Sequence, residues 1–221
     1  MIKAVLFDMD GLLIDSEPIW QEVETKVFSG LGIHLTEEMC KQTMGFRLDE
    51  MVSYWYKFKP WSNDEDAENQ VECEILAGLI LKIIKMAKPM PGVLEILNFL
   101  KSKNIPLAIV SSSPLVIIEA VVKKFKLTEY FQLLHSAESE KYGKPHPSVY
   151  INAAHKLNVL PQESLTFEDS LNGLLSAKSA RTKTVVVPDS KDFNNPVFSI
   201  SDLKLSSLAQ FNENIWDQLN V

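Results

Sequence analysis

The sequence is short of cysteine, of glycine and of long apolar runs, and each shortage excludes a class of protein. Two of its 221 residues are cysteines, Cys40 and Cys73, and neither belongs to a CxxC pair or a Cys/His cluster. A disulfide framework and a zinc site are therefore unsupported. Its 8 glycines and 11 prolines are too few for a fibrous or low-complexity chain. The longest apolar stretch, residues 75–87, contains two lysines and is shorter than the roughly 20 residues of a membrane helix.

Positive charge is also scarce. The chain has 22 basic and 29 acidic residues, a net charge of −7, whereas nucleic-acid binding needs clustered basic groups. The apolar run at the amino terminus meets Asp8 too soon to form a signal peptide. We therefore expect a cytoplasmic monomer without nucleic-acid or membrane partners. Hydrophobic residues make up 46% of the chain, enough for a substantial core.

Short, nearly continuous apolar runs alternate with helical patterns along most of the sequence. Five such runs predict strands, at residues 2–7, 106–110, 131–135, 165–168 and 184–187. Continuous apolar character is typical of parallel strands that are buried on both faces. The alternation of strands and helices predicts an α/β fold with a doubly wound, mostly parallel sheet.

One stretch, residues 16–87, has helical periodicity and no convincing strand. Within it Val71, Ile75, Leu79 and Ile83 recur every four positions. We expect residues 16–87 to form a small helical cap inserted after the first strand. The catalytic core would then comprise residues 1–15 and 88–221. Since ligands of open α/β sheets bind at the carboxyl ends of the strands, this cap would cover the site.

The first polar motif, Asp8-Met9-Asp10-Gly11, directly follows the first predicted strand. Two carboxylates that converge on one point repel each other unless a cation lies between them. Mg²⁺ is the natural partner because it prefers oxygen ligands. The alternative is an ordinary solvated turn.

A second motif, Ser111-Ser112-Ser113-Pro114, follows the next predicted strand and begins a helix. Hydroxyls and free backbone N–H groups at a helix amino terminus favour phosphate, although serine can also simply cap the helix. Lys144 precedes another predicted helix, beside prolines that stiffen the backbone. It could neutralise a phosphate, or remain a solvated charge in a turn.

The last motif is Glu168-Asp169-Ser170, again at the end of an apolar strand. Asp169 or Ser170 could only cap the following helix. This acidic pair would, however, share a sheet edge with Asp8 and Asp10, which favours a role as metal ligand.

These motifs occur in the order acid pair, hydroxyl, lysine, acid pair, and together they resemble the haloacid dehalogenase superfamily. A helical cap after the first motif is similar to that of its β-phosphoglucomutase-like subfamily. The strings FDMDGLLIDSEP, KPHP, EDSLNG, WYKFKPW and KLSSL resemble most the bacterial hexitol phosphatase and 2-deoxyglucose-6-phosphate phosphatase group.

The resemblance implies a role for each matching residue. Asp8 would attack phosphorus and form an aspartyl-phosphate, while Asp10 would protonate the leaving oxygen and later activate water. Lys144 would neutralise the phosphate, which the Ser111 hydroxyl and the Ser112 N–H would hold.

The same resemblance implies a metal cofactor, Mg²⁺, or Mn²⁺ or Co²⁺ in its place. Its ligands would be Asp8, the backbone oxygen of Asp10, and Asp169, with Glu168 as an indirect ligand. For the sugar, Arg47 and Glu17 are candidate substrate-binding residues in the cap. Each could instead be a solvated residue at the start of a helix.

The activity implied is that of a Mg²⁺-dependent phosphatase acting on small hexose or hexitol phosphates. Two alternatives remain: a β-phosphoglucomutase-type mutase, and a regulatory protein that binds sugar phosphates without turnover. The mutases place a histidine shortly after the first motif, whereas residues 15–20 of this chain contain none. We therefore favour hydrolysis.

Overall fold

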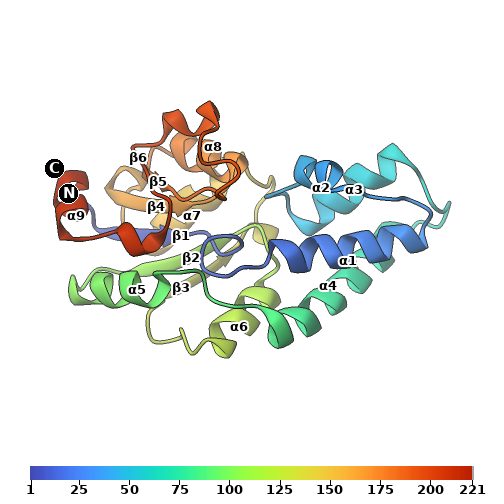
Figure 1. Cartoon of the computed structure of the whole chain (residues 1–221), viewed down its shortest axis with the longest axis horizontal. Coiled ribbons are helices and arrows are strands. Elements are labelled where there is room, and N and C mark those ends of the chain that lie inside the picture. Colours follow the sequence, from blue (N-terminus) through green and yellow to red (C-terminus); the bar gives the residue numbers. More distant parts are fainter. Residues whose placement is uncertain (221) are drawn as a thin grey trace.

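The structure, a computed structural model, describes residues 1–220 and is built around one sheet (Figure 1). Its strands are β1 (Ala4–Phe7), β2 (Leu107–Ser111), β3 (Leu133–Ser136), β4 (Ser164–Glu168), β5 (Lys183–Val186) and β6 (Leu203–Lys204). They lie in the order β3-β2-β1-β4-β5-β6, and every neighbouring pair is parallel. The predicted parallel α/β sheet is confirmed. Strand β6 was not predicted, because two residues give no periodicity.

Helices cover both faces of the sheet. They are α5 (Val93–Ser102), α6 (Leu115–Lys124), α7 (Ser148–Lys156), α8 (Leu171–Ser179) and α9 (Glu213–Leu219). Leu6 of β1 packs in one apolar cluster with Tyr150 of α7. Its neighbour Phe7 packs in another, with Leu97 of α5 and Ile117 of α6. Successive side chains of a strand point to opposite faces, which explains why the strand is apolar at every position.

Between β1 and α5 the chain forms a helical insert. It contains α1 (Glu17–Gly30), α2 (Glu37–Gln42), α3 (Leu48–Phe58) and α4 (Ala67–Met86). Helix α4 packs against α1 and α3 through the predicted four-residue repeat, which includes the fully buried Ile75, Leu79 and Ile83. Trp55 of α3 is also buried in this core. A helical insert after β1 is thus confirmed, and we refer to it as the cap.

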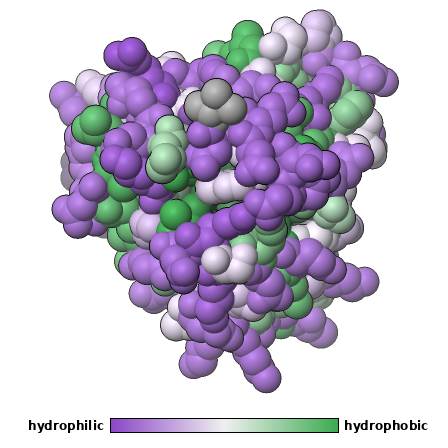
Figure 2. All heavy atoms as spheres, turned by 90° about the vertical axis from the view of Figure 1, so that its left-hand side faces the viewer, coloured by the Kyte–Doolittle hydropathy of each residue, from purple (hydrophilic) through white to green (hydrophobic). Residues whose placement is uncertain are grey.

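The carboxyl ends of the strands point towards the cap, at the right of Figure 1. At the opposite end, where both termini and α9 lie, hydrophilic side chains dominate the surface and apolar ones are scattered (Figure 2). In the described part of the chain, no helix combines the length and apolarity needed to cross a bilayer. A ligand site is therefore expected at the edge between sheet and cap, where the carboxyl ends of the strands lie.

Candidate active site

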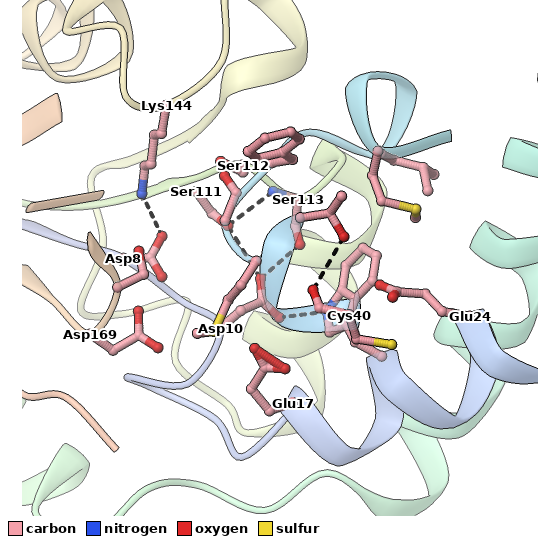
Figure 3. Close-up of a pocket in the computed structure, with 18 of the residues that line it drawn as sticks. Asp8, Asp10, Glu17, Glu24, Cys40, Ser111, Ser112, Ser113, Lys144 and Asp169 are labelled. Carbon is pink, nitrogen blue, oxygen red and sulfur yellow. Dashed lines mark hydrogen bonds and ion pairs between the residues drawn. The ribbon is translucent and has the colours of Figure 1, made fainter. Parts of the chain in front are cut away.

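A pocket between the sheet and the cap gathers most of the polar residues singled out in the sequence (Figure 3). Asp8 follows β1, Ser111 ends β2 and Asp169 follows β4, so their strands deliver them to one edge. Lys144 reaches the same edge from the loop before α7. The predicted residues that line the pocket are Asp8, Asp10, Glu17, Ser111, Ser112, Lys144 and Asp169.

Lys144 is buried, with 3% of its surface exposed, and its ammonium is surrounded by acceptors. It donates to Asp8 Oδ1 at 2.7 Å, to Glu168 Oε1 at 2.7 Å and to the Val110 carbonyl oxygen at 3.2 Å. Burial favours the neutral amine, but the carboxylates of Asp8 and Glu168 outweigh it and raise the pKa of Lys144 above its ordinary value. The site therefore contains a fixed positive charge.

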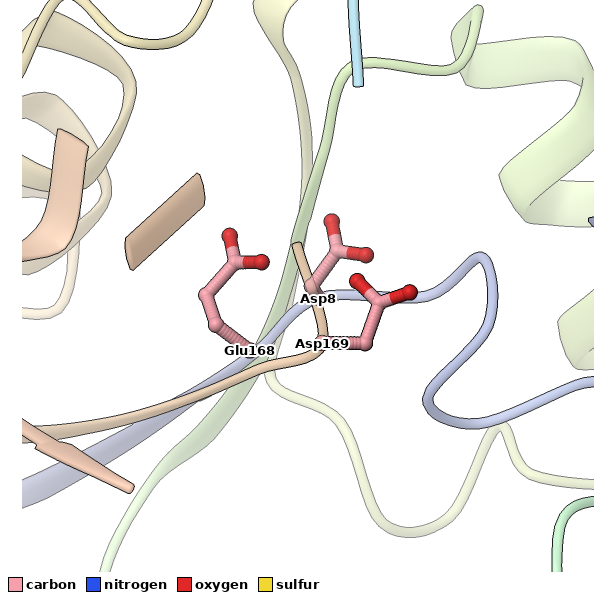
Figure 4. Close-up of side chains that lie close together, drawn as sticks. All are labelled: Asp8, Glu168 and Asp169. Atoms are coloured by element: carbon pink, nitrogen blue, oxygen red, sulfur yellow. The ribbon is translucent and has the colours of Figure 1, made fainter. Parts of the chain in front are cut away.

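Asp8, Glu168 and Asp169 form an acidic cluster whose carboxylate oxygens lie within 4.8 Å of one another (Figure 4). Burial raises the pKa of Asp8 to about 8; Lys144 opposes this shift and Glu168 adds to it. Burial and the Asp8 charge likewise raise the pKa of Asp169. A divalent cation between these oxygens would favour their ionised forms. Oxygen donors of this kind fit Mg²⁺.

Asp10 is oriented by hydrogen bonds from several directions. Its Oδ1 accepts from Ser16 Oγ at 2.7 Å and from Trp20 Nε1 at 3.1 Å. Its Oδ2 accepts from Ser113 Oγ at 2.7 Å and from Ser111 Oγ at 3.3 Å. Within residues 1–220 the Asp10 carboxylate is not part of the acidic cluster. It lines the pocket beside that cluster, which suits a group that exchanges protons rather than binds metal.

Two glycines let the backbone approach the acidic cluster closely. Gly11, at φ +72°, leaves room for Asp169, whose Oδ2 would lie 2.1 Å from a Cβ added there. A Cβ on Gly173 of α8 would lie 1.9 Å from Glu168 Oε2. Both carboxylates are therefore held against backbone that only glycine can supply.

Glu168 is buried behind the pocket, and Tyr150 accounts for part of its position. The Tyr150 hydroxyl donates to Glu168 Oε1, the oxygen that also accepts from Lys144. The Lys144 ammonium lies 5.0 Å from the centre of the Tyr150 ring, within cation–π range. Tyr150 was not among the residues that the sequence singled out. An indirect contact between Glu168 and metal stays a prediction.

Arg47 occupies a position that the sequence did not predict. Its guanidinium donates to the carbonyl oxygens of Ala137 at 3.3 Å and Glu140 at 2.6 Å, and pairs with Asp49 at 2.7 Å. It is not among the described residues that line the pocket. Contact between Arg47 and a substrate stays a prediction, and it requires the guanidinium to leave those carbonyls.

Helix α1 supplies one part of the cap side of the pocket, and α2, α3 and the segment between them supply the rest. From α1, Glu17, Trp20, Gln21 and Glu24 all line the pocket, at spacings that place them on one helix face. Burial and the Asp10 charge raise the pKa of Glu17 to about 7. Burial and the Glu17 charge raise that of Glu24 to about 8. Sequence reasoning selected Glu17 but missed Gln21 and Glu24, although their helical spacing from Glu17 was a usable signal.

Comparisons with known proteins relate this chain to one family of hydrolases. The family model for haloacid dehalogenase-like hydrolases matches residues 5–187. The chain is 40% identical over 210 residues to hexitol phosphatase B of Escherichia coli (strain K12), covering 95% of this chain and 94% of that protein. It is 33% identical over 189 residues to a phosphorylated carbohydrates phosphatase of Thermotoga maritima, covering 81% and 82%.

Solved structures show the same fold. A CbbY variant from Rhodobacter sphaeroides, bound to xylulose 1,5-bisphosphate, superposes with a TM-score of 0.89 at 23% identity over 100% of both chains. A β-phosphoglucomutase from Clostridium difficile gives a TM-score of 0.88 at 23% identity, over 100% of this chain and 97% of that one. At these identities the likeness concerns the fold alone.

Proposed function

The chain belongs to the haloacid dehalogenase-like hydrolase family, and we propose that it is a Mg²⁺-dependent phosphatase of small sugar phosphates, such as hexose and hexitol phosphates. Near full-length similarity to a hexitol phosphatase supports this substrate class. The observation that carries the proposal is the buried Lys144 ammonium, which bridges Asp8 and Glu168 beside the pocket. A positive charge fixed against an acidic cluster is suited to bind a phosphate dianion and a metal together.

In the proposed reaction a carboxylate oxygen of Asp8 attacks phosphorus, the bond to the sugar oxygen breaks, and an aspartyl-phosphate forms. Lys144 attracts the phosphate. The Ser111 hydroxyl and the Ser112 N–H hold oxygens that do not react. A bound Mg²⁺ would add positive charge that reduces repulsion between Asp8 and the phosphate.

The metal would be held by oxygen atoms of residues already described. Asp8 and Asp169 supply carboxylate oxygens, the Asp10 backbone supplies a carbonyl oxygen, and Glu168 acts indirectly. Mn²⁺ also binds carboxylate, carbonyl and water oxygens, and it or Co²⁺ would replace Mg²⁺ in the same ligand set.

Asp10 serves both halves of the proposed reaction. As an acid it gives its proton to the departing sugar oxygen, and as a base it takes a proton from the water that attacks the aspartyl-phosphate. The hydrogen bonds from Ser16, Trp20 and Ser113 hold its carboxyl in one orientation. A phosphate ester needs such a proton donor because an alkoxide is a poor leaving group.

The test is release of inorganic phosphate from a panel of sugar phosphates, with and without a chelator. We expect Asp8→Asn to lower kcat/KM by more than about 10³-fold, and chelation to abolish activity until Mg²⁺ is restored. The exposed Asp217 of α9 supplies a matched control, Asp217→Asn. Turnover that survives both chelation and Asp8→Asn would refute the proposal. So would conversion of β-glucose 1-phosphate to glucose 6-phosphate faster than phosphate release.

A further inference from the structure

Glu24 is an acidic residue of the cap that the proposed chemistry does not use. Only 7% of its surface is exposed, yet it lines the same pocket as Asp8 and Asp10, and its carboxyl points towards the other pocket residues (Figure 3). Within residues 1–220 no cation lowers its pKa, and the Cys40 thiol is its hydrogen-bond partner. A thiol is a weak donor, so this buried carboxyl keeps acceptor capacity that the protein does not fill.

The position of Glu24 on α1 relates it to the reacting groups. Glu17, near enough to Asp10 for the Asp10 charge to raise its pKa, lies seven residues before Glu24 on the same helix face. At 1.5 Å per residue this separation is about 10 Å along the axis, comparable with the length of an extended six-carbon polyol. Gln21 lies between them and also lines the pocket. Polar groups thus extend from Asp10 into the cap.

These groups match the chemistry of a polyhydroxylated chain. A carboxyl group accepts hydrogen bonds from hydroxyls, and the amide of Gln21 both donates and accepts. Hydroxyls of a polyol could therefore satisfy acceptors that the folded protein leaves open. An alkyl chain of equal length has no hydroxyls to donate, so it would leave the buried Glu24 carboxyl without these hydrogen bonds.

We propose that Glu24, assisted by Gln21, is a specificity-determining residue that binds the hydroxyl groups of the substrate farthest from its phosphate. The inference rests on the proposed phosphatase function and specifies its substrate as an extended polyhydroxylated phosphate ester. A site built to hydrogen-bond hydroxyls discriminates strongly against analogues that lack them. Glu24 takes no part in the transfer of the phosphoryl group.

The experiment compares kcat/KM for a hexitol 6-phosphate and for hexyl phosphate, which has the same chain length and no hydroxyls. We expect Glu24→Leu to lower kcat/KM for the hexitol ester at least tenfold and to leave that for hexyl phosphate unchanged or higher. Glu24→Gln should give a smaller loss on the hexitol ester. Glu22→Gln is the control, because Glu22 lies on the exposed side of α1, paired with Lys82.

Equal losses on both esters, in variants whose Tm matches that of the wild type, would overturn the inference, as would an unchanged value for the hexitol ester. Wild-type enzyme that hydrolyses both esters equally well would also overturn it, while leaving the phosphatase proposal intact. Wild-type enzyme that hydrolyses hexose phosphates of the panel but neither of these esters would overturn the inference alone. Wild-type enzyme that releases phosphate from no ester at all would refute the phosphatase proposal itself.

Discussion

At the scale of single residues, Tyr150 positions the Lys144 ammonium indirectly, through Glu168. Its hydroxyl donates to Glu168, which in turn holds Lys144. Tyr150→Phe removes one donor and leaves the rest of the packing in place. We expect kcat to fall about tenfold with KM little changed, and the free energy of unfolding to fall by about 1 kcal/mol. Steady-state kinetics and urea unfolding measure both.

The control is Tyr142→Phe, at a half-exposed tyrosine. Equal kinetics for the two variants would exclude a positioning role for the Tyr150 hydroxyl.

The ionisation of Glu24 should appear in the pH dependence of stability. Burial and the Glu17 charge raise its pKa from 4.5 to about 8 on folding, against the Cys40 hydrogen bond. Between these values the unfolded chain releases a proton that the folded protein keeps, so stability falls as pH rises, by roughly 1 kcal/mol per pH unit. Glu24→Gln should remove this contribution. Urea unfolding at pH 5 and pH 8 measures the free energy of unfolding of both proteins. If the difference in this free energy between Glu24→Gln and the wild type is the same at both pH values, the predicted ionisation of Glu24 is contradicted.

The sequence identified the polar residues at the ends of strands, but of the polar pocket residues on cap helix α1 it identified only Glu17. Asp8, Ser111 and Asp169 were predictable because parallel strands deliver their carboxyl ends to one edge. Glu24 was missed because an acidic residue on an amphipathic helix is ordinarily solvated. Its spacing from Glu17 places it on the same helix face, but only the packing of the cap on the core buries it. Tyr150 was not predictable either, because no sequence pattern reveals which acceptor a buried hydroxyl meets.

At the scale of elements, the first turn of α8 lies against Glu168 because residue 173 has no side chain. Gly173→Ala would place a Cβ 1.9 Å from Glu168 Oε2, forcing Glu168 and Lys144 to move. We expect kcat/KM to fall at least about 10²-fold and the free energy of unfolding to fall by about 1–3 kcal/mol.

Gly30 supplies the matched control for that substitution. It ends α1, and a Cβ added there meets no atom within 4 Å, so Gly30→Ala should keep full activity. Phosphate release and thermal unfolding of the two variants are the measurements. A Gly173→Ala enzyme as active as Gly30→Ala would show that the close approach of α8 has no functional importance.

The strands show which of their features apolar runs in the sequence predict. Residues 165–168 were predicted as a strand, and β4 begins one residue earlier, at Ser164. The run at 131–135 predicted β3 two residues too early, because Phe131 is buried in a loop and buried apolar residues look alike in either setting. Burial follows from the sequence, whereas the ends of each strand depend on backbone pairing.

At the scale of the whole molecule, the cap is fastened to the core near the loop that carries Lys144. Arg47 donates to the carbonyls of Ala137 and Glu140, and Glu50 Oε1 accepts from Gly143 N at 2.9 Å. The sequence predicted a cap over the site, but not these bonds. The core partners in these hydrogen bonds are backbone groups, which every kind of residue has, so the sequence does not indicate them.

Arg47→Ala separates two roles for this residue. If Arg47 chiefly fastens the cap, the variant should lose about tenfold in kcat/KM on hexitol and aryl phosphates alike, because a loosened cap admits water and positions every ester less well. If Arg47 contacts the sugar, only kcat/KM for the hexitol phosphate should fall. The geometry favours the first outcome. Lys57→Ala, at an exposed residue of α3, controls for loss of a positive charge in the cap.

The account as a whole depends on a covalent bond between Asp8 and phosphorus. The most direct measurement is mass spectrometry of enzyme that is quenched in acid during turnover of a hexitol phosphate, using wild type and the Asp10→Asn variant, in which hydrolysis of the intermediate should be slow. We predict one added phosphoryl group on the peptide that contains Asp8, more abundant in Asp10→Asn and missing from Asp8→Asn. An actively turning-over enzyme with no phosphoryl group on that peptide, in either form, would contradict the mechanism.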